Sequence, residues 1–238
     1  QLWSIWRSGR ANPETIAHLQ KQRLARLVAH AREHSPFYAR HLAGLPVNWS
    51  LTDLPPVSKP QLMAQFDDWA TDPAITRAEI DAFITNPALV GQKFRGAYTV
   101  WTTSGSTGQP GIFLHDAESL EIYDLLWLWR GFRPWLGFRS LPLTMRRSFR
   151  ETFVIATGGH YAGAVNAVRL SQKYRWLRDS IEVLSILSPL PELIRELNRK
   201  PPTFLTIYPS ALILLAAAQN AGQLAIKPRC IITSGEGL

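Results

Sequence analysis

The chain has 238 residues, 46% of them apolar, which is enough to bury a sizeable core in one large domain or two small ones. Its single cysteine, Cys230, excludes an internal disulfide framework and fits a reducing compartment; its apolar neighbours predict a buried strand thiol. The net charge of +8 favours polyanionic partners without choosing among them.

The sequence predicts neither insertion into a membrane nor secretion. The longest apolar run, residues 211–218, is far shorter than the ~20 residues that span a bilayer. Residues 1–7 lack a charged leader followed by an apolar core. We therefore expect a cytoplasmic protein with no transmembrane segment.

Residues 1–95 are predicted to form a helical N-terminal region. Asn12 and Pro13 have the residue types of a helix N-cap and first turn, and an apolar stripe at helical spacing follows them. Capping boxes that begin at Ser58 and Thr76 predict two further helix starts. The histidines of this region have no acids or cysteines at ligand spacing, so no metal site is predicted.

Residues 96–238 show alternating strand and helix patterns. Runs rich in β-branched residues predict strands at 98–101, 151–156, 181–186, 203–207 and 229–233. Helices are predicted from near residue 116, at 191–200 and at 210–221. This alternation is typical of α/β proteins, so we expect a mainly parallel sheet with flanking helices and right-handed crossovers.

A basic and aromatic segment follows the helix predicted near residue 116. Arginines recur from position 130 to position 150 with no acid among them, close to Trp127, Trp129 and Trp135. A solvated basic face over packed aromatics, a docking surface for a polyanionic ligand, and a nucleic-acid surface are the alternatives. No known nucleic-acid-binding motif accompanies the segment, so no specific nucleic-acid partner is expected.

A hydroxyl- and glycine-rich loop follows the predicted strand 98–101. Residues 102–111 read Thr-Thr-Ser-Gly-Ser-Thr-Gly-Gln-Pro-Gly. Gly105 and Gly108 can adopt positive φ and let backbone N–H groups converge, while the hydroxyls add donors, a combination that suits phosphate oxygens. The loop lacks the Gly-Lys-Ser/Thr ending of a Walker loop. A polar hairpin turn is the alternative interpretation.

Three further segments lie where parallel sheets bind ligands, beyond the carboxyl ends of strands. They are residues 157–163, which contain Gly-Gly-His-Tyr, residues 208–210, which read Tyr-Pro-Ser, and residues 233–238, which read Thr-Ser-Gly-Glu-Gly-Leu. Each by itself is equally a common strand exit or helix start. Their coincidence with the hydroxyl-rich loop indicates a ligand site.

The order of residues in this loop resembles the ATP-phosphate loop of the adenylate-forming (acyl-CoA synthetase) superfamily. Residues 27–38, residues 54–59 and the three strand exits also resemble the phenylacetate-CoA ligase branch of that superfamily. The resemblance implies that a carboxylate attacks the α-phosphorus of ATP to give an acyl-adenylate and pyrophosphate. A thiol, that of coenzyme A or of a carrier-protein phosphopantetheine arm, then displaces AMP.

The resemblance assigns roles by motif match. The β- and γ-phosphates of ATP would be held by Thr103, Ser104, Gly105, Ser106, Thr107 and Gly108. The adenine would lie against the turn of Ser234, Gly235, Glu236 and Gly237. The acyl pocket would contain Gly159, His160, Tyr161, Tyr208 and Ser210. His160 is the catalytic candidate; it would face the carboxylate or, in an equally weighted alternative, bridge backbone groups.

Two departures from the family pattern limit what the resemblance implies. Gly111 stands where the superfamily loop often has a lysine, so a phosphate-facing cation is missing or supplied elsewhere. The sequence stops at Leu238, before the family's magnesium-binding glutamate, ribose-binding aspartate and C-terminal lysine domain. We therefore expect an N-terminal fragment that cannot complete adenylation alone, with most Mg²⁺ ligands beyond its end.

The substrate and the acceptor stay open. The many aromatic residues favour an aryl or arylalkyl carboxylate, although most of them will be core. Coenzyme A and a carrier protein present the same thiol, and homodimer formation is left undecided. The alternative function, from a different class, is a non-catalytic nucleotide- and acyl-binding or interaction domain derived from this fold.

Overall fold

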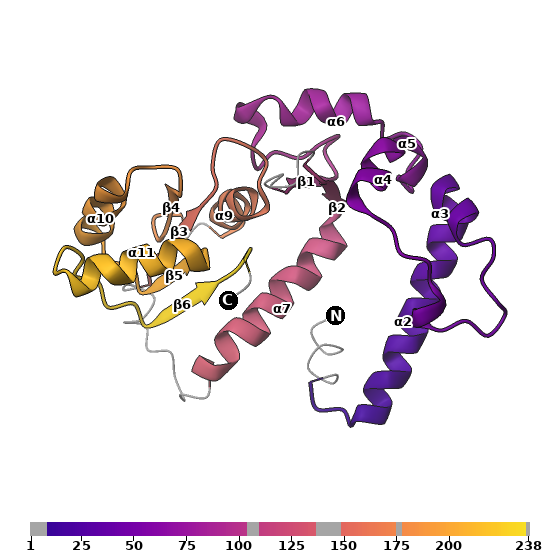
Figure 1. Cartoon of the computed structure of the whole chain (residues 1–238), viewed down its shortest axis with the longest axis horizontal. Helices are drawn as coiled ribbons and strands as arrows, with labels where there is room; N and C mark the ends of the chain where they lie inside the picture. The colour runs from indigo at the N-terminus through magenta and orange to yellow at the C-terminus, as the bar shows by residue number, and fades with distance from the viewer. Residues whose placement is uncertain (1–8, 104–109, 137–148, 175–177, 237–238) are drawn as a thin grey trace.

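A computed structural model describes residues 9–103, 110–136, 149–174 and 178–236 (Figure 1). Its first part is helical, as predicted. It consists of α2 (Pro13–His34), α3 (Pro36–His41), α4 (Lys59–Ala64), α5 (Phe66–Trp69) and α6 (Arg77–Ile84), with short 3₁₀ turns at Leu51–Asp53 and Pro87–Leu89. No helix in the described ranges is both long and apolar enough to cross a bilayer.

The predicted helix starts are confirmed by their caps. The Asn12 side chain accepts a hydrogen bond from the Thr15 N–H at 2.8 Å, and Ser58 and Thr76 accept from the third residue after each of them. Such caps satisfy backbone donors that have no partner within the helix. Local sequence therefore fixes where these helices begin.

The hydroxyl-rich loop connects two antiparallel strands, β1 (Thr99–Thr102) and β2 (Ile112–His115). β1 was predicted from the sequence, whereas β2 was not. Val100 and Ile112 are buried with residues of the N-terminal helices, among them Phe37 and Ile80. This pair of strands therefore shares its hydrophobic core with the helical region, and Figure 1 shows it between those helices and the main sheet.

The main sheet is parallel, which confirms the predicted α/β fold class. Its strands are β3 (Glu151–Ile155), β4 (Ile181–Ser185), β5 (Phe204–Ile207) and β6 (Cys230–Thr233), in the spatial order β4-β3-β5-β6. The helices that accompany it are α7 (Ala117–Leu136), α9 (Ala162–Lys173), α10 (Leu190–Arg199) and α11 (Pro209–Asn220). All strands and helices predicted in this region form, with ends within one or two residues of those expected.

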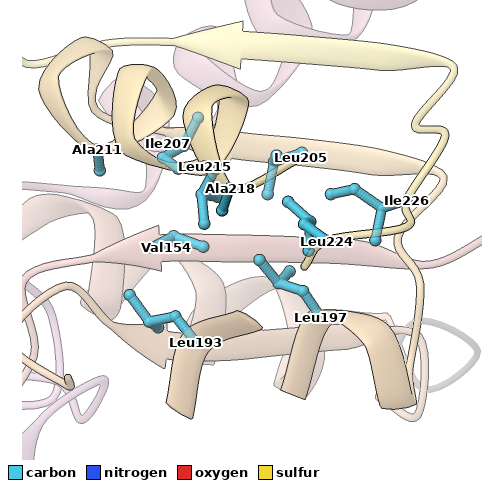
Figure 2. Close-up of a cluster of buried hydrophobic side chains, with 10 residues drawn as sticks. All are labelled: Val154, Leu193, Leu197, Leu205, Ile207, Ala211, Leu215, Ala218, Leu224 and Ile226. Carbon is cyan, nitrogen blue, oxygen red and sulfur yellow. The ribbon is translucent and has the colours of Figure 1, made fainter. Parts of the chain in front are cut away.

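Alternating side chains of the strands face two different helical layers. Val154 and Leu205 pack with Leu197 of α10 and Leu215 of α11 on one face (Figure 2). Phe153, the neighbour of Val154, packs on the opposite face with residues of α9. The sheet is therefore covered on both sides by helices, as parallel sheets require.

A partly buried ion-pair network joins α7 to α9. Asp124 of α7 accepts hydrogen bonds from Arg169 and Lys173 of α9, and its side chain is only 13% exposed. Burial raises the pKa of the Asp124 carboxyl, but the hydrogen bonds from Arg169 and Lys173 outweigh it, so the pKa lies below its ordinary value. The network fixes the helix that follows β2 against the helix that follows β3.

Glu151 is a buried carboxyl at the amino-terminal end of β3, and it is 2% exposed. Burial raises its pKa from 4.5 to about 7, and the hydrogen bond that it accepts from the Thr206 hydroxyl at 3.2 Å offsets only part of this rise. Cys230, which was predicted to be a buried strand thiol, lies on β6 and is only partly buried. Burial raises the pKa of this thiol, and the Glu151 charge adds to the rise.

Glu151→Gln should remove a pH dependence of stability. Because the folded pKa of Glu151 lies above its unfolded value of 4.5, its favourable contribution is fully present below pH 4.5 and is lost as pH rises through about 7. A rise from 4.5 to about 7 corresponds to roughly 3 kcal/mol. We expect Glu151→Gln to be more stable than wild type in urea unfolding at pH 8, with the gain vanishing near pH 4.5. Glu121→Gln, at an exposed position of α7, is the control. A Glu151→Gln variant that is no more stable than wild type at pH 8 would contradict the prediction.

Candidate functional site

The strand order places a topological switch point between β3 and β5. From β3 the chain crosses to β4 on one side, and from β5 it crosses to β6 on the other. The connections that leave these adjacent strands therefore diverge. In open parallel sheets, ligands bind in the crevice that such divergence leaves beyond the carboxyl ends of the strands. The two strand exits at this point are residues 156–161 and 208–210.

Backbone pairing holds the base of the hydroxyl-rich loop at the exit of β3. The Thr102 N–H donates to the His160 carbonyl at 2.7 Å, and Thr102 pairs with Tyr161 as a parallel bridge. The base itself is closed by two hydrogen bonds between Thr103 and Gly111. The Thr103 N–H donates to the Gly111 carbonyl at 3.0 Å, and the Gly111 N–H donates to Thr103 Oγ1 at 2.8 Å.

The predicted phosphate-binding residues fall partly within the described structure. Thr103 is exposed, and its hydroxyl oxygen is engaged by the Gly111 N–H. The other predicted members, Ser104, Gly105, Ser106, Thr107 and Gly108, lie outside the described residues. What the structure describes is therefore the base of the loop, which lies at the exit of β3 beside the switch point of the sheet.

His160 is buried between the exit of β3 and the N-terminal region. Its side chain is 2% exposed, its ring centroid lies 5.0 Å from that of Phe83, and Nε2 lies 3.4 Å from the Asn86 carbonyl oxygen, to which it can donate. Burial lowers the pKa of the imidazole, and the Asn86 hydrogen bond opposes this only in part, so the neutral form is favoured. The imidazole thus lies within hydrogen-bonding distance of a backbone carbonyl, an arrangement consistent with the bridging alternative for His160.

The exits of β5 and β6 are held together. The Tyr208 ring lies against Gly235, where a Cβ would lie only 2.7 Å from Tyr208 Cε1. The φ of Gly235 is +87°, a backbone conformation that glycine adopts readily. The Tyr208 hydroxyl lies 3.5 Å from the Ala156 N–H, across the switch point. Tyr208 therefore spans the distance from the turn after β6 to the exit of β3.

Glu236 caps the amino terminus of α11. Its carboxylate oxygens accept from the Ser210 N–H and the Ser210 hydroxyl, both at 3.0 Å. A carboxylate at this position also interacts favourably with the helix dipole. Both polar groups of Ser210, predicted to line an acyl pocket, are thus engaged by a residue of the predicted adenine turn.

The predicted residues that the structure describes come together at one edge of the sheet. Gly159 lies close to the Tyr161 ring, since a Cβ at position 159 would be 3.3 Å from it. Gly237 lies outside the described residues, as do Arg139, Arg146 and Arg147 of the basic segment. Trp127, Trp129 and Trp135 belong to α7, but their side chains lie outside the described part.

The sequence did not single out the partners of these residues. Asn86 and Phe83, which enclose His160, lie in the helical region and carry no motif. Lys59 was noted in a capping box and in the segment 54–59 without a role of its own, and its stem lies over Gly111 at the loop base. Within the described ranges, no three His, Cys, Asp or Glu side chains gather closely enough to hold a metal ion.

Comparison with known proteins bears on the fold. No protein-family model matches the chain, and no curated protein matches it in sequence. A solved structure that is similar is 2-hydroxyisobutyryl-CoA ligase in an open conformation, in complex with 2-HIB-AMP and CoA; the TM-score is 0.50 at 20% sequence identity. The match covers 91% of this chain and 46% of the ligase chain. At this identity the likeness shows a shared fold alone, and the chain spans less than half the length of that ligase.

Gly235→Ala should destabilise the protein more than Gly222→Ala. Both glycines have positive φ, of +87° and +72°, so each alanine pays about 1–2 kcal/mol of backbone strain. Only at position 235 does the new Cβ also meet the Tyr208 ring, because nothing lies within 4 Å at Gly222. Urea unfolding should show an excess cost of about 1 kcal/mol at position 235. Equal costs for the two variants would contradict the packing of Tyr208 on Gly235.

His160→Ala should lower stability even with no ligand present. The change leaves the Asn86 carbonyl without its donor and removes the contact with Phe83, at an expected cost of about 2–3 kcal/mol. His18→Ala, at an exposed position of α2, is the matched control and should change stability by less than about 0.5 kcal/mol. Thermal unfolding of the two variants makes the comparison. A His160→Ala variant as stable as wild type would show that the bridge contributes nothing to folding.

Proposed function

We propose that this chain carries the nucleotide- and acyl-binding part of an AMP-forming carboxylate ligase. In the first step, a carboxylate oxygen attacks the α-phosphorus of ATP, and the bond from that phosphorus to the pyrophosphate oxygen breaks. In the second step, a thiol of coenzyme A or of a carrier protein attacks the acyl carbon and AMP leaves. Catalysis of this kind depends mainly on positioning and on neutralising charge.

One observation carries this proposal. The bond from the Thr102 N–H to the His160 carbonyl, at 2.7 Å, holds the hydroxyl-rich loop at the switch point of a parallel sheet. A loop rich in backbone and hydroxyl donors suits phosphates, and the switch point is where open α/β sheets bind nucleotides. The net charge of +8 also favours an anionic ligand.

The proposed roles follow the sequence motifs. Residues 103–108 hold the β- and γ-phosphates, and residues 234–237 lie against adenine. Gly159, Tyr161 and Tyr208 border the acyl group, since Tyr208 reaches from Gly235 to Ala156. We assign His160 a positioning role in place of direct contact with the carboxylate, because its ring is buried against Phe83 and Asn86.

We propose an aromatic acid as the substrate, on the similarity of residues 27–38 and 54–59 to phenylacetate-CoA ligases. The chain spans 46% of the length of the CoA ligase that shares its fold. We propose that it does not complete adenylation by itself and that Mg²⁺ binds with ligands that it does not supply. Pyrophosphate release by this chain with any carboxylate would contradict the first of these statements.

Two observations favour the alternative, a non-catalytic binding domain derived from the same fold. Gly111 replaces the lysine that this loop often carries, and the catalytic candidate His160 is engaged by a backbone carbonyl. Such a domain would bind a nucleotide or an acyl ligand without turnover.

The first experiment measures ATP binding to this chain by titration calorimetry. We expect binding that weakens about 10-fold or more in Ser104→Ala and Thr107→Ala, because each loses a hydrogen bond to a charged group. Ser171→Ala, which removes a hydroxyl from α9 that donates to the Val168 carbonyl, is the control. Wild-type chain that binds no ATP, or loop variants that bind as wild type does, would overturn the proposed site.

A second measurement separates the ligase from the binding domain. Pyrophosphate release by the full-length gene product is followed with a panel of aryl and aliphatic carboxylates. Carboxylate-dependent release that collapses in Ser104→Ala and Thr107→Ala supports the ligase and identifies its acid. ATP binding without release from any acid supports the binding domain.

A further inference from the structure

We propose that Glu236 is a positioning residue of the nucleotide site, which holds the turn after β6 in place for the nucleoside part of the nucleotide. The inference rests on the proposed nucleotide-binding function, and it assigns this task to a side chain that reaches the exit of the neighbouring strand. It concerns residues 234–236, the part of the predicted adenine turn that the structure describes.

The start of α11 is capped from outside the helix. Its N-cap residue is Tyr208, whose side chain forms no capping hydrogen bond, and Pro209 in the next position has no N–H to satisfy. The first donor of the helix is therefore the Ser210 N–H, which the side chain of an N-cap serine, threonine, asparagine or aspartate ordinarily binds. Its acceptor here is Glu236, 26 residues further along the chain.

The Glu236 carboxylate is held by both of its oxygens. Oε2 accepts from the Ser210 N–H and Oε1 accepts from the Ser210 hydroxyl, each at 3.0 Å. Two hydrogen bonds to one residue fix the direction of the carboxylate as well as its position, and the helix dipole favours its charge. The backbone at position 236 is therefore tied to the first turn of α11.

Two further contacts hold the same turn against the exit of β5. The Ser234 N–H donates to the Ile207 carbonyl at 3.4 Å, which extends the pairing of β5 with β6 past the end of β6. Gly235 lies against the Tyr208 ring. Three successive residues of the turn thus contact the exit of β5. Of these three contacts, that of Glu236 is made by a side chain of the turn, so a substitution can remove it without altering the others directly.

The turn lies at the carboxyl edge of the sheet, one strand away from the switch point between β3 and β5. A nucleoside presents a flat base with little charge, so its affinity depends on a surface that is already in position before it binds. Without the Glu236 carboxylate, the ligand would have to order residues 234–236 at the expense of affinity. Because Ser210 engages this carboxylate, Glu236 acts through the position of the turn and not by contact with the base.

The test compares the binding of AMP and of tripolyphosphate to wild type, Glu236→Ala and Glu236→Gln by titration calorimetry. AMP contains the nucleoside, whereas tripolyphosphate is a phosphate chain without it. In Glu236→Ala, which loses both bonds to Ser210, we expect AMP binding to weaken about 10-fold or more and tripolyphosphate binding to change less than about threefold. The amide of Glu236→Gln can accept from the Ser210 N–H and donate to the Ser210 hydroxyl oxygen, so AMP affinity should stay within about threefold of wild type.

The matched control is Glu192→Ala, which removes an exposed glutamate from the first turn of the neighbouring helix α10. This variant should bind both ligands as wild type does. If Glu236→Ala fails to fold, Ser210→Ala removes one of the two bonds to the carboxylate, and it should weaken AMP binding without changing tripolyphosphate binding.

Wild-type chain that binds neither ligand would overturn the proposed function and, with it, this inference. Wild-type chain that binds tripolyphosphate but no AMP would overturn the proposed adenine turn and the role of Glu236. If wild type binds both, a folded Glu236→Ala variant with unchanged AMP affinity would overturn the role of Glu236 alone. Equal losses of AMP and tripolyphosphate binding in that variant, or a loss of the same size in Glu192→Ala, would do the same.

Discussion

The structure around the candidate site depends on one backbone contact, the pairing of Thr102 and Tyr161 with its hydrogen bond from the Thr102 N–H to the His160 carbonyl. β1 and β2 are packed into the core of the N-terminal helices, whereas β3 belongs to the parallel sheet. This pairing joins the two. Through it, the base of the hydroxyl-rich loop lies at the exit of β3, at the carboxyl edge of the parallel sheet.

The side chain of His160 reinforces the same junction. Its backbone carbonyl accepts from Thr102 while its ring lies against Phe83 and reaches the Asn86 carbonyl, so one residue contacts both β1 and the segment at the end of α6. Burial keeps the imidazole neutral, which suits a residue that bridges a carbonyl in a confined space. The helical region thus helps to hold the exit of β3, through Phe83 and Asn86.

The amino-terminal and carboxyl-terminal edges of the parallel sheet carry different charged side chains. Glu151, with a pKa of about 7, is buried at the amino-terminal end of β3, away from the candidate site. At the carboxyl edge, Glu236 is engaged by Ser210 at the start of α11, and Lys59 lies over the base of the loop.

The sequence by itself determined the starts of the capped helices α2, α4 and α6, the strands of the parallel sheet and the loop with a composition suited to phosphate, because caps, β-branched runs and glycine-rich turns are local patterns. It missed α9, Ala162–Lys173, and it missed β2, whose four residues, Ile112–His115, pair with β1. It also left the role of His160 undecided and gave Lys59 none. Tertiary structure decided where these two side chains lie, because the burial of the His160 imidazole and the path of the Lys59 stem over Gly111 depend on segments far apart in the chain.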